Sequence, residues 1–513
     1  MLLSLLGVAA AAWVTFRIYE AVPHIEDEYA YTWQAAVIAS GKLTLPSPPE
    51  PRSFLIPFVV DYQGLRFGKY PIGWPAVLAV GVWLGLRSWV NPLLAGLGVW
   101  LTYRLGKRVF SPFVGLLAAL LTLTSPFFLM NSGTLLSHPL SLVLSAAFGL
   151  GWLEAFSQPQ AQGPRLPAAA LTLPQARGLW LPAVAAGLAL GWLVVTRPLT
   201  ALAVALPFGL HGLYLLWRGD RSVRFRLAVF GLLVLAVTLL YPLYQSAATG
   251  DPWKNTYLLW WPYDKVGFGP GIGATESGHT LQKAFFSARR DLFVGSFDIF
   301  GWPGLSYCLA LFGLWAGRRN LQTWLTGSLF GMLVLAYLVY WVGGYLFGPR
   351  YYYEGLLSLS ILSAAGFAWL AGFPLSNTLT PAPPPRGEGK IRRLGFSALL
   401  TALVGFNLFF YMPFRLGQMY RLFGIGAQEL APFQMAEAQA LAPALVFVDS
   451  ERWMHYAIYT DLESPDLSSP FIFAWAYGTR QDTRVAAKFP QRKVFYYYPD
   501  EPGRFYTAPR PPK

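Results

Sequence analysis

The first 33 residues of the chain read MLLSLLGVAAAAWVTFRIYEAVPHIEDEYAYTW, and this stretch decides the fold class. An apolar run over residues 2–19 leads directly into a segment that contains Glu20, Glu26, Asp27 and Glu28. The run approaches the length of about 20 apolar residues that crosses a bilayer. It lacks the basic n-region of a secretory signal peptide, so we expect a retained first transmembrane helix, while a start further upstream stays open.

The composition extends this prediction to the whole chain. Its 513 residues are 55% hydrophobic and only 12% charged, with a mean hydropathy of +0.41. Soluble domains carry about twice that share of charge, so lipid must face much of the surface. The net charge of +14 comes from short loops between apolar runs, which argues against a nucleic-acid partner. The single cysteine, Cys308, rules out an internal disulfide.

Twelve apolar runs are candidate membrane spans. They lie near residues 2–19, 72–86, 89–103, 111–129, 138–156, 179–195, 198–217, 227–246, 301–317, 322–346, 353–373 and 394–413.

Five connections between these runs are basic and are therefore predicted to be cytoplasmic. They hold Arg104, Lys107 and Arg108; Arg165 and Arg177; Arg218, Arg221, Arg224 and Arg226; Arg318 and Arg319; and Arg386, Lys390, Arg392 and Arg393. Because the acidic first loop reads as outside, an odd number of crossings must separate it from the Arg104 cluster. The shorter of the two intervening runs, residues 71–86, is expected to lie along or dip into the outer surface. Eleven spans result, with the N-terminus inside and the C-terminus outside.

This topology divides the chain into two regions. Residues 1–414 form the predicted transmembrane domain, with outer loops at 20–88 and 247–300, and residues 415–513 form a small extracytoplasmic domain. The latter holds three strand-like runs between turn residues, at 444–448, 471–477 and 493–499. The predicted fold class is an all-α polytopic membrane protein with a juxtamembrane helix and a small α+β C-terminal domain.

Charged residues at the outer boundary are the candidate functional groups. Neighbouring carboxylates such as Asp27 and Glu28 are costly there unless a cation, a metal or a catalytic proton uses them; a solvated acidic loop is the alternative. Lys69, Arg197 and Arg350 are placed to bind phosphate, and the planar fork of arginine matches phosphate oxygens. Contact with lipid headgroups is the alternative for these cations.

Two outer histidines are further candidates. His138 begins an apolar run, and His279 follows a glycine string, GFGPGIG at 267–273. Either could contact substrate, although a lone histidine is more often structural. The glycines do not follow a strand of a βαβ unit, which excludes a nucleotide-binding fingerprint. The five histidines show no zinc spacing, and no serine or cysteine nucleophile motif is present.

The order of these segments resembles a known family. An early helix, an acid pair in the first outer loop, GKYPIGWP at 68–75 and the RP turn at Arg197 resemble the GT-C glycosyltransferases, in particular the protein O-mannosyltransferase and aminoarabinose transferase-like group (glycosyltransferase family 39-like). The segments GFGPGIG…GHT at 267–280 and GPRYYYE at 348–354 resemble bacterial members. The likeness covers roughly residues 1–360, and the ordered set is more specific than the acid pair alone.

The resemblance implies an inverting transferase in the plasma membrane that moves a sugar from a polyprenyl-phosphate donor to an extracytoplasmic acceptor. Within it we expect Asp27 as the catalytic base, Glu28 as its partner or a metal ligand, and Lys69, Arg197 and Arg350 as clamps for the donor phosphate. Further substrate contacts are expected from His138, His279 and Tyr351.

The resemblance leaves three points open. Relatives place an aspartate where this chain has His138, so a divalent metal ion is undecided. The β-trefoil domain of eukaryotic O-mannosyltransferases is absent, which weakens protein as the acceptor, and the sugar is not specified. The rival function is a transporter or flippase of a lipid-linked or anionic substrate, which would place charges near the midplane and show internal repeats.

Overall fold

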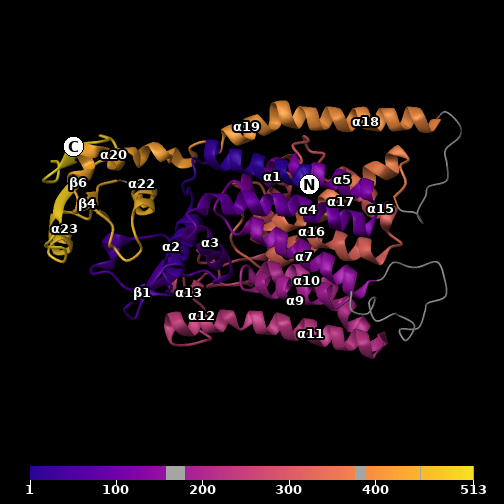
Figure 1. Ribbon diagram of the computed structural model, residues 1–513, viewed down its shortest axis with the longest axis horizontal. Helices are drawn as coiled ribbons and strands as arrows, with labels where there is room; N and C mark the ends of the chain where they lie inside the picture. Colours follow the sequence, from indigo (N-terminus) through magenta and orange to yellow (C-terminus); the bar gives the residue numbers. More distant parts are fainter. Residues whose placement is uncertain (158–178, 376–387, 451, 512–513) are drawn as a thin grey trace.

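The computed structural model describes residues 1–157, 179–375, 388–450 and 452–511. Arg165, Arg177 and Arg386 of the predicted cytoplasmic loops lie outside these ranges. Long helices run side by side along the longest axis, and the strands gather toward one end of the molecule (Figure 1). The long helices are α1 (Leu2–Trp13), α4 (Val90–Val109), α5 (Pro112–Leu123), α7 (His138–Phe156), α9 (Trp180–Val194), α10 (Pro198–Arg218), α11 (Arg221–Thr238), α12 (Leu240–Thr249), α15 (Cys308–Gly317), α16 (Leu321–Tyr337), α17 (Leu356–Ala371) and α18 (Glu388–Phe406).

Five helical segments of the described residues are long and apolar enough to cross a membrane. They are His138–Phe156, Pro198–Arg218, Arg221–Thr249, Arg350–Ala371 and Gly389–Gln434. A sixth crossing is formed if α5 and α6 (Pro126–Ser132), bent by 61° relative to each other, make one span. Shorter apolar helices add Leu2–Ile18, Gly73–Trp83, Trp180–Val194, Cys308–Gly317 and Leu321–Tyr337. The number eleven stays a prediction.

Local sequence explains where helices break and where they touch. Pro126 starts α6 and Ser125 caps it, its Oγ accepting from Phe128 N at 3.1 Å, so the chain bends between α5 and α6. Helices α15 and α17 pack against each other through glycine. A Cβ on Gly313 would lie 1.8 Å from the Leu362 carbonyl oxygen, and one on Gly366 would lie 2.0 Å from that of Leu309.

Basic residues from two of the predicted cytoplasmic connections lie at the ends of α4 and α10. Arg104 at the end of α4 lies 3.3 Å from Glu154 at the end of α7, and Arg108 donates to the carbonyl of Leu153 at 3.0 Å. Helix α10 ends at Arg218 and begins beside Arg197 at the opposite end. Arg197, one of the candidate site residues, therefore lies at the end of α10 away from these cations.

The first outer loop contains structure that the sequence pattern did not predict. Helix α2 (Glu26–Ala39) is followed by a three-stranded antiparallel sheet in the order β1-β3-β2, formed by β1 (Leu45–Pro46), β2 (Val59–Tyr62) and β3 (Leu65–Gly68). Helix α3 (Gly73–Trp83) comes next and packs on α2. Its 11 residues span roughly 16 Å, about half of a bilayer core, and that this run does not cross stays a prediction.

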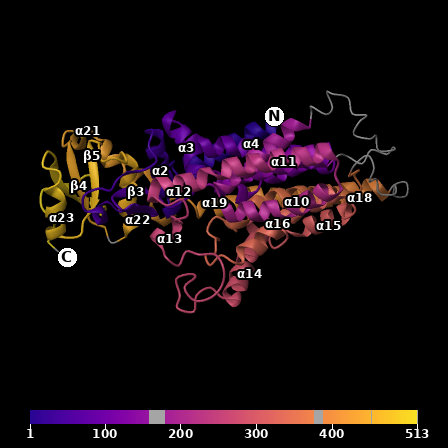
Figure 2. The same ribbon diagram turned by 90° about the horizontal axis from the view of Figure 1, so that it is seen from below.

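Two other predicted ranges differ from the structure. The expected span 322–346 ends as a helix at Tyr337, and the residues up to Pro349 form an irregular segment. The expected outer loop 247–300 contains α13 (Tyr257–Trp260) and α14 (Leu281–Asp298). Figure 2 shows α14 and the loop before it projecting from the side of the bundle. Helix α14 exposes Phe285, Phe286 and Phe293, but these residues do not belong to an apolar run long enough to cross a membrane. A search of the sequence for membrane spans therefore misses this helix.

The C-terminal region holds the three strands expected from the sequence. They are β4 (Ala444–Val448), β5 (Phe471–Trp475) and β6 (Lys493–Tyr497), joined by a short β7 (Phe505–Tyr506) in the order β5-β4-β6-β7. The three long strands are parallel, with α22 (Trp453–Ala457) and α23 (Thr479–Ala486) in the connections. This alternation is an α/β arrangement, which corrects the expected α+β fold, because strand runs alone do not reveal their pairing direction. Six short helical elements lie between α18 and β4, namely the π-helix Asn407–Tyr411, α19 (Met412–Gly417), the 3₁₀ turns Leu422–Gly424 and Ala427–Glu429, α20 (Ala431–Gln434) and α21 (Ala436–Gln439).

Candidate active site

Asp27 sits in the first turn of α2, and its neighbour Glu28 holds that turn in place. One Glu28 oxygen accepts from the backbone N–H groups of His24 at 2.8 Å and Ile25 at 3.2 Å, which caps the helix. The other accepts from Leu135 N at 2.7 Å, which joins α2 to the turn before α7. Glu28 is 2% exposed, and burial raises the pKa of its carboxyl to about 7 against the effect of these three N–H donors.

The carboxylate of Asp27 faces two partners from distant parts of the chain. Its Oδ1 accepts a hydrogen bond from the Tyr70 hydroxyl, and its Oδ2 lies 3.5 Å from Nη1 of Arg350. The side chain of Asp27 is 21% exposed and that of Arg350 is 14% exposed. Asp27 is thus partly accessible and already paired with a cation.

Lys69 is enclosed by aromatic rings and by one carboxylate. Its Nζ donates to Oδ2 of Asp264 at 3.1 Å, and the lysine is 2% exposed. Burial lowers the pKa of Lys69, whereas the Asp264 charge works in the opposite direction. The ring centres nearest to Nζ are those of Phe58 at 3.8 Å, Trp261 at 4.8 Å, Tyr70 at 5.2 Å and Tyr257 at 5.2 Å. Tyr70, next in sequence, connects this lysine to Asp27.

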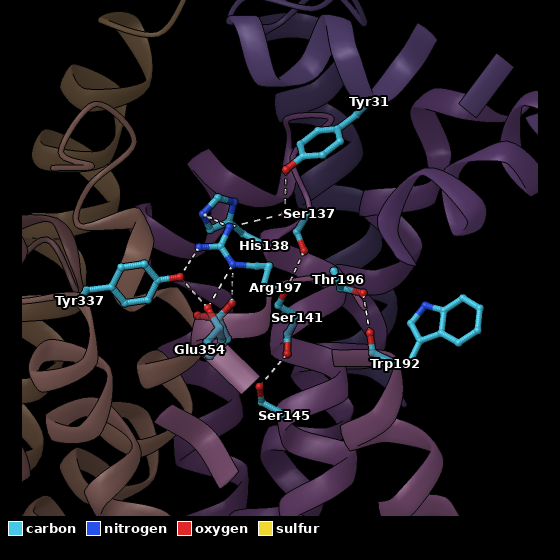
Figure 3. A network of polar contacts seen from close by, with 11 residues as sticks. Tyr31, Ser137, His138, Ser141, Ser145, Trp192, Thr196, Arg197, Tyr337 and Glu354 are labelled. Atoms are coloured by element: carbon cyan, nitrogen blue, oxygen red, sulfur yellow. Dashed lines mark hydrogen bonds and ion pairs between the residues drawn. The ribbon is translucent and has the colours of Figure 1, made fainter. Parts of the chain in front are cut away.

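Arg197 is the centre of a polar network between α7, α10, α16 and the 3₁₀ helix Arg350–Gly355 that precedes α17 (Figure 3). Its Nη1 contacts Nε2 of His138 at 3.0 Å, and its Nη2 donates to the Tyr337 hydroxyl at 3.0 Å. Its Nε lies 3.7 Å from the fully buried carboxylate of Glu354. Arg197 directly precedes Pro198, the first residue of α10, so the arginine lies at the N-terminus of this helix.

Tyr351 joins the two arginines. The guanidinium carbon of Arg350 lies 5.4 Å from the centre of the Tyr351 ring, and that of Arg197 lies 5.8 Å from it. The ring stacks on Tyr337, with centroids 4.9 Å apart. The two cations therefore share one aromatic wall.

The structure thus brings together most of the residues that the sequence singled out. Asp27, Lys69, Arg197, Arg350, His138 and Tyr351 belong to one connected cluster. His279 has other contacts. Its Nε2 meets the Leu338 carbonyl at 2.9 Å and its ring stacks on Phe268, so it fastens the preceding loop to the segment after α16. A role in substrate contact stays a prediction for His279.

Sequence reasoning missed four residues of the cluster. They are Tyr70, Asp264, Tyr337 and Glu354. Tyr70 and Glu354 lie inside the two quoted segments, GKYPIGWP and GPRYYYE, and adjacency to Lys69 and Arg350 was a usable signal. Asp264 and Tyr337 carry no such signal, because only the fold brings them near a cation.

These residues do not offer a ligand set for a divalent metal. Asp27 faces a guanidinium and a phenol, and Glu28 is turned onto backbone N–H groups. Within the described ranges, no group of three or more histidine, cysteine, aspartate or glutamate side chains gathers at one place.

A cleft of about 480 Å³ lies on another face of α2. Tyr29, Trp33 and Ala36 line it from the helix, and the C-terminal region adds Asp461, which pairs with Arg87 at 2.5 Å. Residues of α2 that face the acid–cation cluster, such as Asp27, are not among its lining. The cleft is separate from the candidate active site.

The comparisons with known proteins bear on the fold. No protein-family model matches the chain, and no curated protein sequence matches it significantly. Among solved structures, ArnT from Cupriavidus metallidurans bound to undecaprenyl phosphate aligns over 96% of this chain and 88% of its own, with a TM-score of 0.57 and 16% identity. The chain has the GT-C fold.

A second GT-C structure matches almost as fully. The archaeal oligosaccharyltransferase AglB from Archaeoglobus fulgidus, in complex with an inhibitory peptide and a dolichol-phosphate, aligns over 96% of this chain and 69% of its own. The TM-score is 0.51 and the identity is 13%. The GT-C fold expected from the order of the sequence segments is thus confirmed, and with it a multi-pass membrane architecture.

Proposed function

We propose that this protein is an inverting glycosyltransferase that takes a sugar from a polyprenyl-phosphate donor and places it on an extracytoplasmic acceptor. The observation that carries the proposal is the cluster itself. A partly exposed carboxylate, Asp27, faces Arg350, and Lys69 and Arg197 are linked to the same pair through Tyr70 and Tyr351.

The proposed chemistry is a single displacement at the anomeric carbon. The acceptor hydroxyl oxygen forms a bond to this carbon while Asp27 accepts the hydroxyl proton. The bond from the carbon to the phosphate oxygen breaks on the opposite face, and its electron pair stays on that oxygen. Attack and departure on opposite faces invert the configuration.

The cations are proposed to stabilise the departing phosphate. Charge grows on its oxygens as the bond breaks, and fixed cations aimed at that position lower the barrier. Arg350 and Arg197 bring planar guanidinium groups held by Tyr351, Tyr337 and Glu354, and Lys69 brings a point charge.

Glu28 is proposed to position the base and not to react. Both of its oxygens are already used by backbone N–H groups, and the side chain is 2% exposed. This is a change from the catalytic or metal-ligating role expected from the sequence. His138, in contact with Arg197 through Nε2, is proposed to orient that guanidinium.

Two observations support the proposed lipid carrier and the proposed side of the membrane. The donor tail reaches the cluster from the bilayer that surrounds the helices, and the neighbours carry undecaprenyl phosphate and dolichol-phosphate in their structures. The cluster lies at the end of the bundle away from Arg104 and Arg108, which supports an extracytoplasmic site.

A transfer assay tests the proposal. The purified protein in lipid nanodiscs receives a panel of radiolabelled undecaprenyl-phosphate sugars with membrane extract as acceptor. We expect release of undecaprenyl phosphate and labelled acceptor with at least one donor, and neither with Asp27→Asn. In proteoliposomes, movement of intact donor between leaflets without bond cleavage would instead establish the transporter function.

A further inference from the structure

Asp264 forms an ion pair with Lys69, the lysine that is proposed to bind the donor phosphate. Lys69 can donate three hydrogen bonds, and Asp264 takes one of them at 3.1 Å. Rings surround the ammonium on its other sides, with four centres within 5.2 Å. An incoming phosphate therefore meets a cation whose counter-ion is already in place.

The carboxylate of Asp264 is held firmly from the other side. Its Oδ1 accepts from the Tyr340 hydroxyl at 3.2 Å and from Nε1 of Trp341 at 3.1 Å. Asp264 is 6% exposed. The same carboxylate thus joins the first outer loop, through Lys69, to the segment that follows α16.

The residues around Asp264 are pinned to that segment at further points. We call residues 263–280 the latch segment. Gly267 N donates to the Val339 carbonyl at 2.7 Å, and Val266 pairs with Tyr340. At its far end, His279 contacts the Leu338 carbonyl at 2.9 Å. These contacts hold the latch segment against residues 338–341.

A donor phosphate and Asp264 cannot share this space without cost. Both are anions, and the ammonium between them is buried, so water cannot screen the repulsion. Either the phosphate is refused or the carboxylate leaves Lys69. The backbone of the latch segment is suited to such a movement, because glycine adopts a wide range of backbone angles. Glycines at positive φ occur at 267, 269, 271, 273 and 278.

We propose that Asp264 is the resident counter-ion of Lys69 and that the donor phosphate displaces it, which frees the latch segment from residues 338–341. The inference rests on the proposed function, since it needs Lys69 to bind the donor phosphate. It adds that the donor phosphate and the Asp264 carboxylate compete for Lys69. An anionic lipid therefore releases the latch segment, whereas a neutral lipid of the same chain length leaves it in place.

Two measurements on the full-length protein in nanodiscs test the competition. Farnesyl phosphate is the probe and farnesol is the neutral control, and each is titrated by calorimetry. Hydrogen exchange of the latch segment is followed by mass spectrometry with and without each lipid. In the wild type, farnesyl phosphate raises exchange in the latch segment and farnesol does not.

Asp264→Asn removes the competing charge. It binds farnesyl phosphate about fivefold or more tightly than the wild type, because the phosphate no longer has to displace a carboxylate from Lys69 before it binds. Its latch segment exchanges fast with or without lipid. Glu276→Gln is the matched control, since it removes the same charge from an exposed position of the same segment and leaves both readouts at the wild-type level.

Tyr340→Phe is a second variant that keeps all charges. It deletes one hydrogen bond to Asp264 and raises latch exchange in the absence of lipid, so the test does not depend on the folding of Asp264→Asn. Unchanged or weaker farnesyl phosphate binding by a folded Asp264→Asn protein, or wild-type latch exchange that ignores farnesyl phosphate, would overturn the inference.

Lys69→Met separates this inference from the function on which it rests. If Lys69→Met loses farnesyl phosphate binding while Asp264→Asn is unchanged, the lysine binds phosphate and Asp264 is no competitor. If Lys69→Met binds as well as the wild type, the phosphate role of Lys69 itself is wrong.

Discussion

The Oδ2 atom of Asp27 lies 3.5 Å from Nη1 of Arg350, although one residue comes from the first outer loop and the other from the last turn before α17. The ion pair joins the proposed base to a proposed phosphate clamp. It keeps the carboxylate oriented before substrate arrives, with Tyr70 on its second oxygen. In the proposed displacement the base and the phosphate clamp act on opposite faces of the anomeric carbon, so the two side chains must move apart when the sugar binds between them.

Replacing Asp27 with Asn is expected to lower transfer by about a hundredfold to ten-thousandfold, the usual contribution of a positioned general base. The amide keeps the shape of the side chain but cannot accept the hydroxyl proton. The rate is measured in a single turnover with pre-bound donor, so that weaker binding does not enter.

Glu26→Gln is the matched control for Asp27→Asn. Glu26 is the preceding acid in the same helical turn, and its charge also acts on Arg350 and Lys69. Among the described residues, however, no ion pair joins it to either cation, so this variant changes a nearby charge and keeps the Asp27 carboxylate. We expect near-normal transfer from this variant and an unchanged melting temperature for both. A folded Asp27→Asn protein with wild-type turnover would remove Asp27 from the mechanism.

Arg350→Lys and Arg350→Ala are expected to differ. Lysine keeps the charge but loses the fork that spans a carboxylate or phosphate edge, so a partial loss of kcat is expected, whereas alanine also leaves Asp27 without its cation. The comparison uses kcat and KM for one donor. Equal losses in the two variants would indicate that geometry, and not charge alone, is what Arg350 supplies; wild-type rates in both would exclude it as a clamp.

The sequence predicts those features of the site and the topology that depend on residues close together in the chain. Basic loops and an acidic first loop indicate which end of the bundle carries the site, and Asp27, Lys69, Arg197 and Arg350 stand out because charges at a lipid boundary are costly. The three C-terminal strands were visible as apolar runs. These signals depend on residues close together in the chain.

Features that depend on packing could not be read in this way. Asp264 and Tyr337 become part of the cluster only because the latch segment and the end of α16 fold back onto it. Glu28 reads as a second catalytic acid, yet its oxygens face the N–H groups of Ile25 and Leu135, and no spacing rule reports that direction. The parallel order of the C-terminal strands is likewise a property of pairing.

Glu28 gives a pH dependence of stability with a definite sign. Its folded pKa of about 7 lies above the ordinary 4.5, so between these values the folded protein holds a proton that the unfolded chain has released. Stability therefore falls as pH rises from about 4.5 to about 7, by roughly 3 kcal/mol for this group alone. Above that range the contribution is constant.

Glu28→Gln is expected to remove this slope. Unfolding is followed by tryptophan fluorescence at closely spaced pH values between 4 and 8, and the wild-type curve is compared with those of Glu28→Gln and the exposed-site control Glu276→Gln. The control should retain the wild-type slope. If Glu28→Gln retains it as well, the buried carboxyl does not titrate in this window.

Arg197 and Glu354 allow a double-mutant test of the polar network. Glu354 is fully buried, and Arg197 supplies the nearest cation, 3.7 Å away. Arg197→Gln leaves that carboxylate without its charge partner, which costs about 3–5 kcal/mol of unfolding free energy. Arg197→Gln with Glu354→Gln removes both charges together, so it should recover much of that stability while transfer stays low, because the phosphate clamp is still missing. Recovery of transfer along with stability would mean that Arg197 serves only to neutralise Glu354, whereas a double variant as unstable as Arg197→Gln would show that the two side chains are not coupled.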